Sequence, residues 1–278
     1  DGLTGVNTVK LTALISKNIV SKKIKTAAKM RAMKVIRTRN NNDQQKYGLA
    51  YGNLYGTRIE DEEISFALND VYKIHAVYES ENDNDAEPPY LTLTESTFFD
   101  NGSVVVGRTS GARGRVIQFI NSTLRLYVVQ LNEVPFLPGE TIDGVDDDNT
   151  PLTAIIDDAE GSVFKGSKVV TTQYELEPGQ KAHFYDVCKM LRLPQYTPPI
   201  RKLLVIFDYF VHESSGDYFA SQSYTGIGYK EIPKYKLDGS INFLKDQIDF
   251  RPGVGELASG AGTITNEFYV NCASLDFG

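Results

Sequence analysis

From Thr97 to Ile156 the sequence is a succession of short apolar runs separated by turn residues. Runs of this length and spacing are shorter than ordinary helices and are typical of antiparallel sandwiches and barrels. We therefore predict a small β-barrel module over residues 90–160. Its expected strands are Thr97–Phe99, Ser103–Arg108, Gly114–Phe119, Thr123–Leu131, Glu140–Ile142 and Ala154–Ile156.

The rest of the chain also favours strands. Among its 278 residues are 16 Tyr and 14 Phe but no Trp, and 41% of the residues are hydrophobic. This composition suits half-buried strands, and the length permits substantial cores. We predict an all-β fold with minor α content, in which the small β-barrel is inserted into a larger β-sandwich-like domain.

Two acidic segments suggest the domain boundaries. Glu79–Pro89 ends in Pro88-Pro89 and indicates a boundary near residue 90, whereas Asp143–Thr150 precedes a second boundary near residue 160. Residues 41–89 and 161–278 are then expected to form the sandwich-like domain. Its expected strands are Thr57–Leu68, Val71–Tyr78, Ser167–Glu175 and Lys202–Phe210, with Asn69-Asp70 joining the first two.

One segment of the larger domain favours a helix. In Gln180–Leu193 the apolar residues are spaced roughly as on one helical face. They are Phe184, Val187, Cys188 and Leu191.

Charge is distributed unevenly along the chain. Residues 1–40 contain ten Lys and Arg against Asp1, a net charge of +9, so the total of −7 leaves −16 for residues 41–278. We predict a basic N-terminal arm that is partly helical or becomes ordered against an acidic neighbour. Nucleic acid is not the expected partner, because the arm lacks interleaved aromatic residues. The predicted partner-binding residues are Lys22, Lys23, Lys25, Lys29, Arg31, Lys34, Arg37 and Arg39.

Catalytic motifs do not emerge from the sequence. The histidines are His75, His183 and His212, and no Ser occupies a Gly-x-Ser-x-Gly turn. His212-Glu213 begins a zinc-protease motif, but Gly216 stands where its second His would be. We interpret His212 as a strand-end or loop residue with a satisfied hydrogen bond. The protein is predicted to be non-enzymatic.

Cofactor and metal motifs are also incomplete. Asp146, Asp148 and Asp157 fit three positions of a calcium loop, but Pro151 stands where the turn glycine is required. A looser calcium site in Asp143–Asn149 is the alternative to a solvated acidic loop. Gly253–Gly262 fits neither phosphate-binding fingerprint. No cofactor is expected.

Cys188 and Cys272 lack metal-ligand spacing, and we expect both to be reduced and buried. No run of apolar residues is long enough for a membrane-spanning helix. The sequence opens on Asp1 without a signal peptide, so we expect a portion of a longer protein.

The stretch from Gly179 to Pro252 carries a set of aromatic and acidic motifs. They are Gly179-Gln180, Phe184-Tyr185-Asp186, Asp208-Tyr209-Phe210, Gly216-Asp217-Tyr218-Phe219, Ser223-Tyr224, Ile232-Pro233-Lys234-Tyr235 and Ile248-Asp249-Phe250-Arg251-Pro252. Together they resemble the large modular tail and baseplate proteins of T4-like myoviruses, especially those that infect cyanobacteria. Tyr72–Ser80, Val106-Gly107 with Ser110-Gly111-Ala112, and Pro138-Gly139-Glu140 also look like parts of these proteins.

The resemblance implies a structural component of a contractile tail, in the baseplate or fibre-attachment region. Such a protein is assembled in the host cytoplasm, resides in the virion, and contacts other tail subunits and copies of itself. The resemblance implies packing roles for Asp208, Tyr209, Phe210, Asp249, Phe250, Arg251 and Pro252. Asp249 is expected to pair with Arg251 across a bend at Pro252, with Phe250 buried.

The alternative function is binding of a receptor or host surface glycan at a fibre tip. Tyr47-Gly48, Tyr51-Gly52 and Tyr55-Gly56 form a tyrosine-glycine loop whose rings suit stacking on sugars, and the 90–160 barrel is a second candidate surface. A polysaccharide-degrading tailspike would require a cleft with paired carboxylates, and we assign no such pair.

Overall fold

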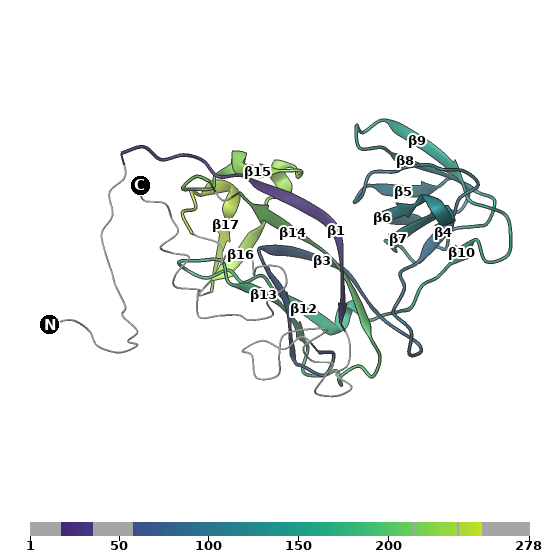
Figure 1. The fold of residues 1–278 in the computed structure, drawn as a ribbon, viewed down its shortest axis with the longest axis horizontal. Coiled ribbons are helices and arrows are strands. Elements are labelled where there is room, and N and C mark those ends of the chain that lie inside the picture. The colour runs from purple at the N-terminus through teal and green to yellow at the C-terminus, as the bar shows by residue number, and fades with distance from the viewer. Residues whose placement is uncertain (1–17, 36–57, 214, 238, 252–278) are drawn as a thin grey trace.

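The computed structural model describes residues 18–35, 58–213, 215–237 and 239–251, and their fold is almost entirely β (Figure 1). The helical turns of the described residues are single 3-10 turns: η1 Asn121–Thr123, η2 Thr171–Gln173, η3 Ser221–Ser223, η4 Tyr229–Glu231 and η5 Leu244–Asp246. The predicted fold class, all-β with little helix, is confirmed.

The larger module contains a five-stranded sheet in the order β11-β3-β14-β1-β15. Its strands are β1 Lys25–Val35, β3 Val71–Glu79, β11 Lys168–Val169, β14 Leu203–His212 and β15 Tyr224–Thr225. All neighbours pair antiparallel except β1 and β15, which are parallel. A second sheet has the order β12-β13-β2, formed by β2 Glu63–Asn69, β12 Tyr174–Glu177 and β13 Val187–Arg192.

The two sheets enclose a common apolar core. Val205 and Phe207 of β14 pack with Phe66 of β2 and Met190 of β13. The chain passes from one sheet to the other between β2 and β3, at Asp70, whose backbone adopts a left-handed conformation (φ 55°). The larger module is therefore a sandwich, followed by a hairpin of β16 Lys234–Leu237 and β17 Ser240–Phe243.

The smaller module is a closed barrel. Its sheet has the order β10-β4-β7-β6-β5-β8-β9, and the bridge between Leu93 and Ile156 joins the end of β4 to the end of β9. The strands are β4 Tyr90–Thr92, β5 Val104–Gly107, β6 Arg113–Ile120, β7 Arg125–Gln130, β8 Thr141–Val145, β9 Pro151–Ile155 and β10 Val163–Phe164. Its core, which includes Leu91, Val116, Leu126 and Ile142, comes from within the barrel sequence.

Glu140 fastens one rim of this barrel. Its buried carboxylate accepts hydrogen bonds from the backbone N–H groups of Leu137 (2.7 Å), Ser110 (3.0 Å) and Thr109 (3.2 Å). A Cβ atom on Gly107 would lie 2.7 Å from both carboxylate oxygens, so glycine leaves room for this contact. The structure thus joins two of the segments that the tail-protein resemblance singled out.

The barrel packs on the outer face of the five-stranded sheet. Ile117 of β6 and Val129 of β7 contact a cluster that includes Tyr78 of β3 and Leu204 and Ile206 of β14. Because alternate side chains of β14 are buried on opposite faces, its sequence is a nearly continuous apolar run.

The chain enters and leaves the barrel at adjacent points. The Glu87 N–H donates to Ser167 Oγ (2.9 Å), and the Ser167 N–H donates to the Glu87 carbonyl (2.8 Å). Strands β4 and β10 pair directly beside this junction. The insertion is therefore attached by two neighbouring segments.

Several sequence-based predictions are wrong. Thr97–Phe99 is not a strand, and the expected strand Ser167–Glu175 is divided into β11 and β12 by the 3-10 turn η2. Lys25–Val35 is not part of a separate basic arm: it forms β1, between β14 and β15 of the sandwich. The segment Gln180–Leu193 contains a strand, β13, instead of a helix. A register shift between Val187 and Lys189 interrupts the alternation of buried and exposed residues along β13. Because of this irregularity, the spacing of the apolar residues in the sequence resembled that of a helix.

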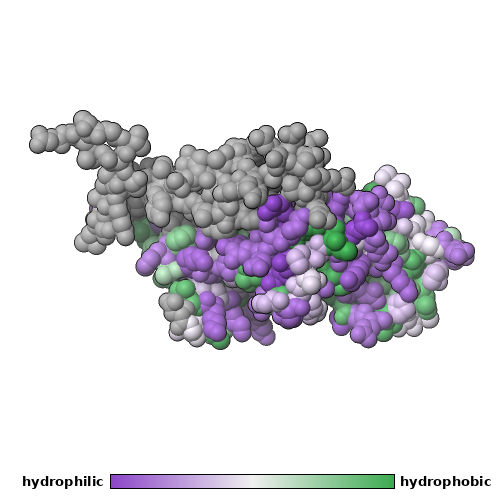
Figure 2. Space-filling view, turned by 90° about the horizontal axis from the view of Figure 1, so that it is seen from below, coloured by the Kyte–Doolittle hydropathy of each residue, from purple (hydrophilic) through white to green (hydrophobic). Residues whose placement is uncertain are grey.

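The described part of the face shown in Figure 2 is mainly hydrophilic, with small scattered apolar patches. Within the described residues no helix has the length and apolar character needed to cross a membrane.

Candidate functional site

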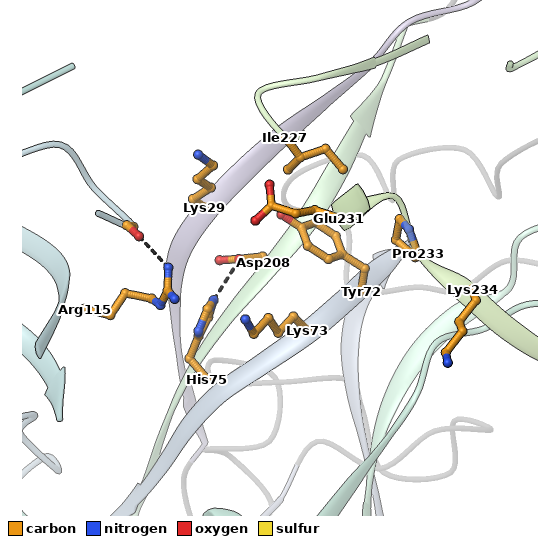
Figure 3. Close-up of a pocket in the computed structure, with 11 residues that line it drawn as sticks. Lys29, Tyr72, Lys73, His75, Arg115, Asp208, Ile227, Glu231, Pro233 and Lys234 are labelled. Carbon is orange, nitrogen blue, oxygen red and sulfur yellow. Dashed lines mark hydrogen bonds and ion pairs between the residues drawn. The ribbon is translucent and has the colours of Figure 1, made fainter. Parts of the chain in front are cut away.

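A cavity of about 430 Å³ lies at the junction of the sandwich, the barrel and the C-terminal segment (Figure 3). Strands β1, β3 and β14 contribute Lys29, Tyr72, Lys73, His75 and Asp208; the barrel contributes Gly102 and Arg115; the C-terminal segment contributes Ile227, Glu231, Pro233 and Lys234. Residues distant in sequence thus meet here, so the site depends on the assembled fold.

Asp208 organises the floor of the cavity. Its Oδ1 atom accepts a hydrogen bond from the Met30 N–H (2.7 Å), and its Oδ2 atom lies 2.7 Å from His75 Nε2. Met30 stands in a bulge of β1 with φ 53°, where the register against β14 shifts. The bulge removes this amide from the ladder, and the carboxylate satisfies it. Both carboxylate oxygens of Asp208 therefore contact groups of the sandwich itself, Met30 and His75.

The cavity carries more positive than negative charge. Three lysines and an arginine line it, namely Lys29, Lys73, Arg115 and Lys234, against the carboxylates of Asp208 and Glu231. Arg115 Nη1 donates to the Gly102 carbonyl (2.6 Å), and Glu231 accepts from the Gly228 N–H (2.8 Å). Among the described residues, no ion pair engages Lys29 or Lys73. The cavity is therefore suited to an anionic group.

A second polar cluster is buried in the sandwich. Lys25 Nζ, whose side chain is fully buried, lies 2.7 Å from Asp70 Oδ2, and His212 Nε2 lies 2.7 Å from the same oxygen. His212, the last residue of β14, has the satisfied hydrogen bond that the sequence predicted. Burial lowers the pKa of Lys25, although Asp70 opposes this shift.

The predicted pair of Asp249 and Arg251 is confirmed, with two contacts of 2.9 Å between guanidinium and carboxylate. Burial would raise the pKa of Asp249, but the hydrogen bonds from Arg251 and Tyr185 outweigh it and lower the pKa. Phe250, expected to be buried, is 58% exposed, because the paired flanking side chains turn inward and leave its ring outside. Pro252 lies outside the described residues.

The other motif residues have packing roles. Phe210 is buried and stacks on Tyr72, with ring centroids 4.3 Å apart. Tyr209 packs at the edge of the sandwich core.

The predicted partner-binding residues differ in their burial and in their contacts. Lys25 is buried inside the chain and is unavailable to a partner, which corrects that prediction. Lys34 pairs with Asp85 of the acidic segment (2.7 Å), so part of the basic charge is neutralised within the chain. Lys29 lines the cavity, Lys22 and Arg31 are exposed, and Lys23 is half-buried. Arg37 and Arg39 lie outside the described residues.

Sequence reasoning missed Lys73, His75, Arg115 and Glu140. Lys73 and His75 lie in β3, where two register shifts against β14 break the alternation that would have assigned them to one face. Glu140 belongs to a segment that the resemblance singled out, but its role depends on a loop 30 residues away.

Other predicted features are partly described. Cys188 is a buried free thiol, as expected, whereas Cys272 and the tyrosine-glycine loop lie outside the described residues. Within the described ranges, no group of three or more His, Cys, Asp or Glu side chains could hold a metal ion. Asp146 instead accepts a hydrogen bond from the Thr150 N–H (2.7 Å), which shapes the acidic loop.

Comparisons with protein-family models, with curated proteins and with solved structures find no match to this chain.

Proposed function

We propose that this chain is a non-enzymatic structural subunit of a contractile bacteriophage tail, in the baseplate or fibre-attachment region. The observation that carries the proposal is the cationic cavity at the junction of the chain's parts. The resemblance of the motifs between Gly179 and Pro252 to tail proteins supplies the class of assembly.

The cavity suits an acidic segment of a neighbouring subunit. Bringing lysines together opposes folding through like-charge repulsion, and an anion bound between them offsets that cost. The mainly hydrophilic face in Figure 2 also favours recognition through charge.

A second copy of the chain carries a fitting group. In the barrel's acidic loop, Asp147 and Asp148 are exposed at the turn between β8 and β9. Docking of this loop into the cavity of another copy joins two different surfaces, so the contact is head-to-tail. Such contacts build the rings and stacks of which tails consist.

Electron cryomicroscopy of the intact particle tests the location. We expect this chain at the baseplate or fibre attachment, in contact with other subunits. Density only at a free fibre tip would replace the proposal with the receptor-binding alternative.

Charge-reversal variants test whether the acidic loop of one copy docks into the cavity of another. The variants K29E/K73E and D147K/D148K are each expected to weaken self-association of the full chain at low salt, measured by sedimentation velocity. Mixing the two variants should restore the association through the reversed pair. The exposed Lys165→Glu serves as a control that leaves the cavity intact. A chain that remains monomeric at low salt, or variants that associate like the parent, would contradict the head-to-tail contact.

A further inference from the structure

Lys25 and Asp70 form a contact pair that is sealed from solvent. The side chains of Lys25 and Asp70 are 0% and 2% exposed, and Nζ lies 2.7 Å from Oδ2. Lys25 belongs to β1, whereas Asp70 stands at the crossing between β2 and β3. The backbone of each is fixed by the sandwich, so the amine and the carboxyl are held together.

Aromatic rings surround the amine. Nζ lies 3.9 Å from the ring centroid of Tyr185, 4.4 Å from that of Phe219 and 5.2 Å from that of Tyr224. Burial among these rings lowers the pKa of Lys25, despite the opposing effect of Asp70. A buried lysine with a lowered pKa more readily supplies the neutral amine, which is the nucleophilic form.

The carboxyl has neighbours that can polarise it and move protons. His212 Nε2 contacts the same Oδ2 atom at 2.7 Å, and Gln180 Nε2 donates to Oδ1 (3.3 Å). The hydroxyl oxygen of Tyr185 accepts a hydrogen bond from Lys25 Nζ (2.7 Å), and the Tyr185 hydroxyl donates one to Asp249. Burial lowers the pKa of His212, which favours the neutral imidazole beside the oxygen that would leave.

The ground state is an ion pair. Burial raises the pKa of Asp70, but Lys25 and His212 outweigh burial and hold that pKa well below its usual range. Transfer of one proton from ammonium to carboxylate converts the pair into a neutral amine and a carboxylic acid. A desolvated site reduces the cost of this transfer, because both charges disappear together.

We propose that Lys25 and Asp70 condense to an intramolecular isopeptide bond. Lys25 Nζ attacks Asp70 Cγ, and Gln180 stabilises the developing charge on Oδ1. The bond from Cγ to Oδ2 breaks, and Oδ2 leaves as water. Two of the three ammonium protons leave with it, transferred across the 2.7 Å contact between Nζ and Oδ2, and the third stays on the amide nitrogen. No oxidant or other reactant is required.

The product would link β1 covalently to the crossing between the two sheets. It would join two residues 45 positions apart in the sequence and hold β1 in place between β14 and β15. This inference is independent of the proposed tail function.

Intact-mass spectrometry of the purified, denatured full chain tests the bond. We expect a mass lower than the sequence mass by one water, together with a branched peptide in a protease digest that contains both Lys25 and Asp70. The full sequence mass after prolonged incubation of the folded protein would overturn the proposal.

Dehydration at an Asp-Gly step is the chemical alternative, and the sequence has three such steps, Asp1-Gly2, Asp143-Gly144 and Asp238-Gly239. Fragmentation of the digest locates the lost water, and a loss mapped only to these steps would also overturn the proposal. Lys25→Arg keeps the positive charge but removes the amine nucleophile, so its mass should match its own sequence. The wild-type measurement is decisive even if this variant folds poorly.

Discussion

At the scale of single residues, buried carboxylates organise turns and bulges of this protein. Asp208 satisfies the amide freed by the β1 bulge, and Glu140 gathers three backbone N–H groups at the barrel rim. Neither needs a ligand to account for its position. These two buried carboxylates are therefore parts of the scaffold.

Glu140→Gln tests this role in the barrel. The amide keeps the shape but replaces a charged acceptor with a neutral one and places an NH₂ group among donors. We expect a loss of about 1–3 kcal/mol in the free energy of unfolding. Urea unfolding followed by circular dichroism measures it. The exposed Glu133→Gln is the matched control and should change little.

The same carboxylate predicts a dependence on pH. Burial would raise the pKa of Glu140, but the hydrogen bonds from Leu137, Ser110 and Thr109 outweigh it and lower the pKa. Its stabilising contribution is therefore present above the unfolded-state pKa of about 4 and is lost as pH falls through the lower folded-state pKa. The free energy of unfolding should fall less between pH 7 and pH 3 in Glu140→Gln than in the parent. Equal losses would exclude the carboxylate as the source.

Sequence separation decided which residue contacts could be predicted. Asp249 and Arg251 are two positions apart, so a local bend was enough to suggest their pairing. Lys25, Asp70 and His212 are separated by 45 and 142 positions, and only the completed sandwich brings them together.

At the scale of elements, β1 shows why charge alone is an incomplete guide. Its basic residues suggested an arm, yet Met30 and Val35 are buried and its backbone pairs with β14 along most of its length. The alternation of apolar and polar residues along β1 is interrupted by the bulge at Met30 and by the buried Lys25. For these reasons the sequence analysis did not predict a strand at β1.

Deletion of residues 1–35 is expected to abolish cooperative folding of the sandwich, because it removes the strand between β14 and β15. A synthetic peptide of residues 18–35 added in trans should restore part of the native structure by pairing with the open edge of β14. Circular dichroism and limited proteolysis, with a sequence-scrambled peptide as control, measure both effects. A truncated chain that unfolds like the parent would show that β1 is dispensable.

At the scale of the whole molecule, sequence reasoning recovered the insertion of one β module into another. Pro88-Pro89 and the acidic segment located the first boundary, and the last barrel strand ends at Phe164, close to the expected limit of 160. The packing of the barrel on the sandwich was not foreseen, because Ile117 and Val129 look like core residues of the barrel itself.

The barrel should fold alone. Its core is built from residues between Leu91 and Ile156, and its sheet closes on itself. A fragment of residues 88–166 is therefore expected to give a cooperative thermal transition and dispersed amide signals in NMR. Ile117→Ser and Val129→Ser, which replace side chains that contact the sandwich, should improve its solubility. A fragment that stays unfolded would mean that the sandwich is needed to form the barrel.

The two hydrogen bonds between Glu87 and Ser167 also bear on how such a gene can change. A recombination event that exchanged the DNA between these two codons would replace the entire barrel while every strand of the sandwich kept its neighbours. A single recombination event would thus replace the barrel with another module and leave the sequence of the sandwich unchanged.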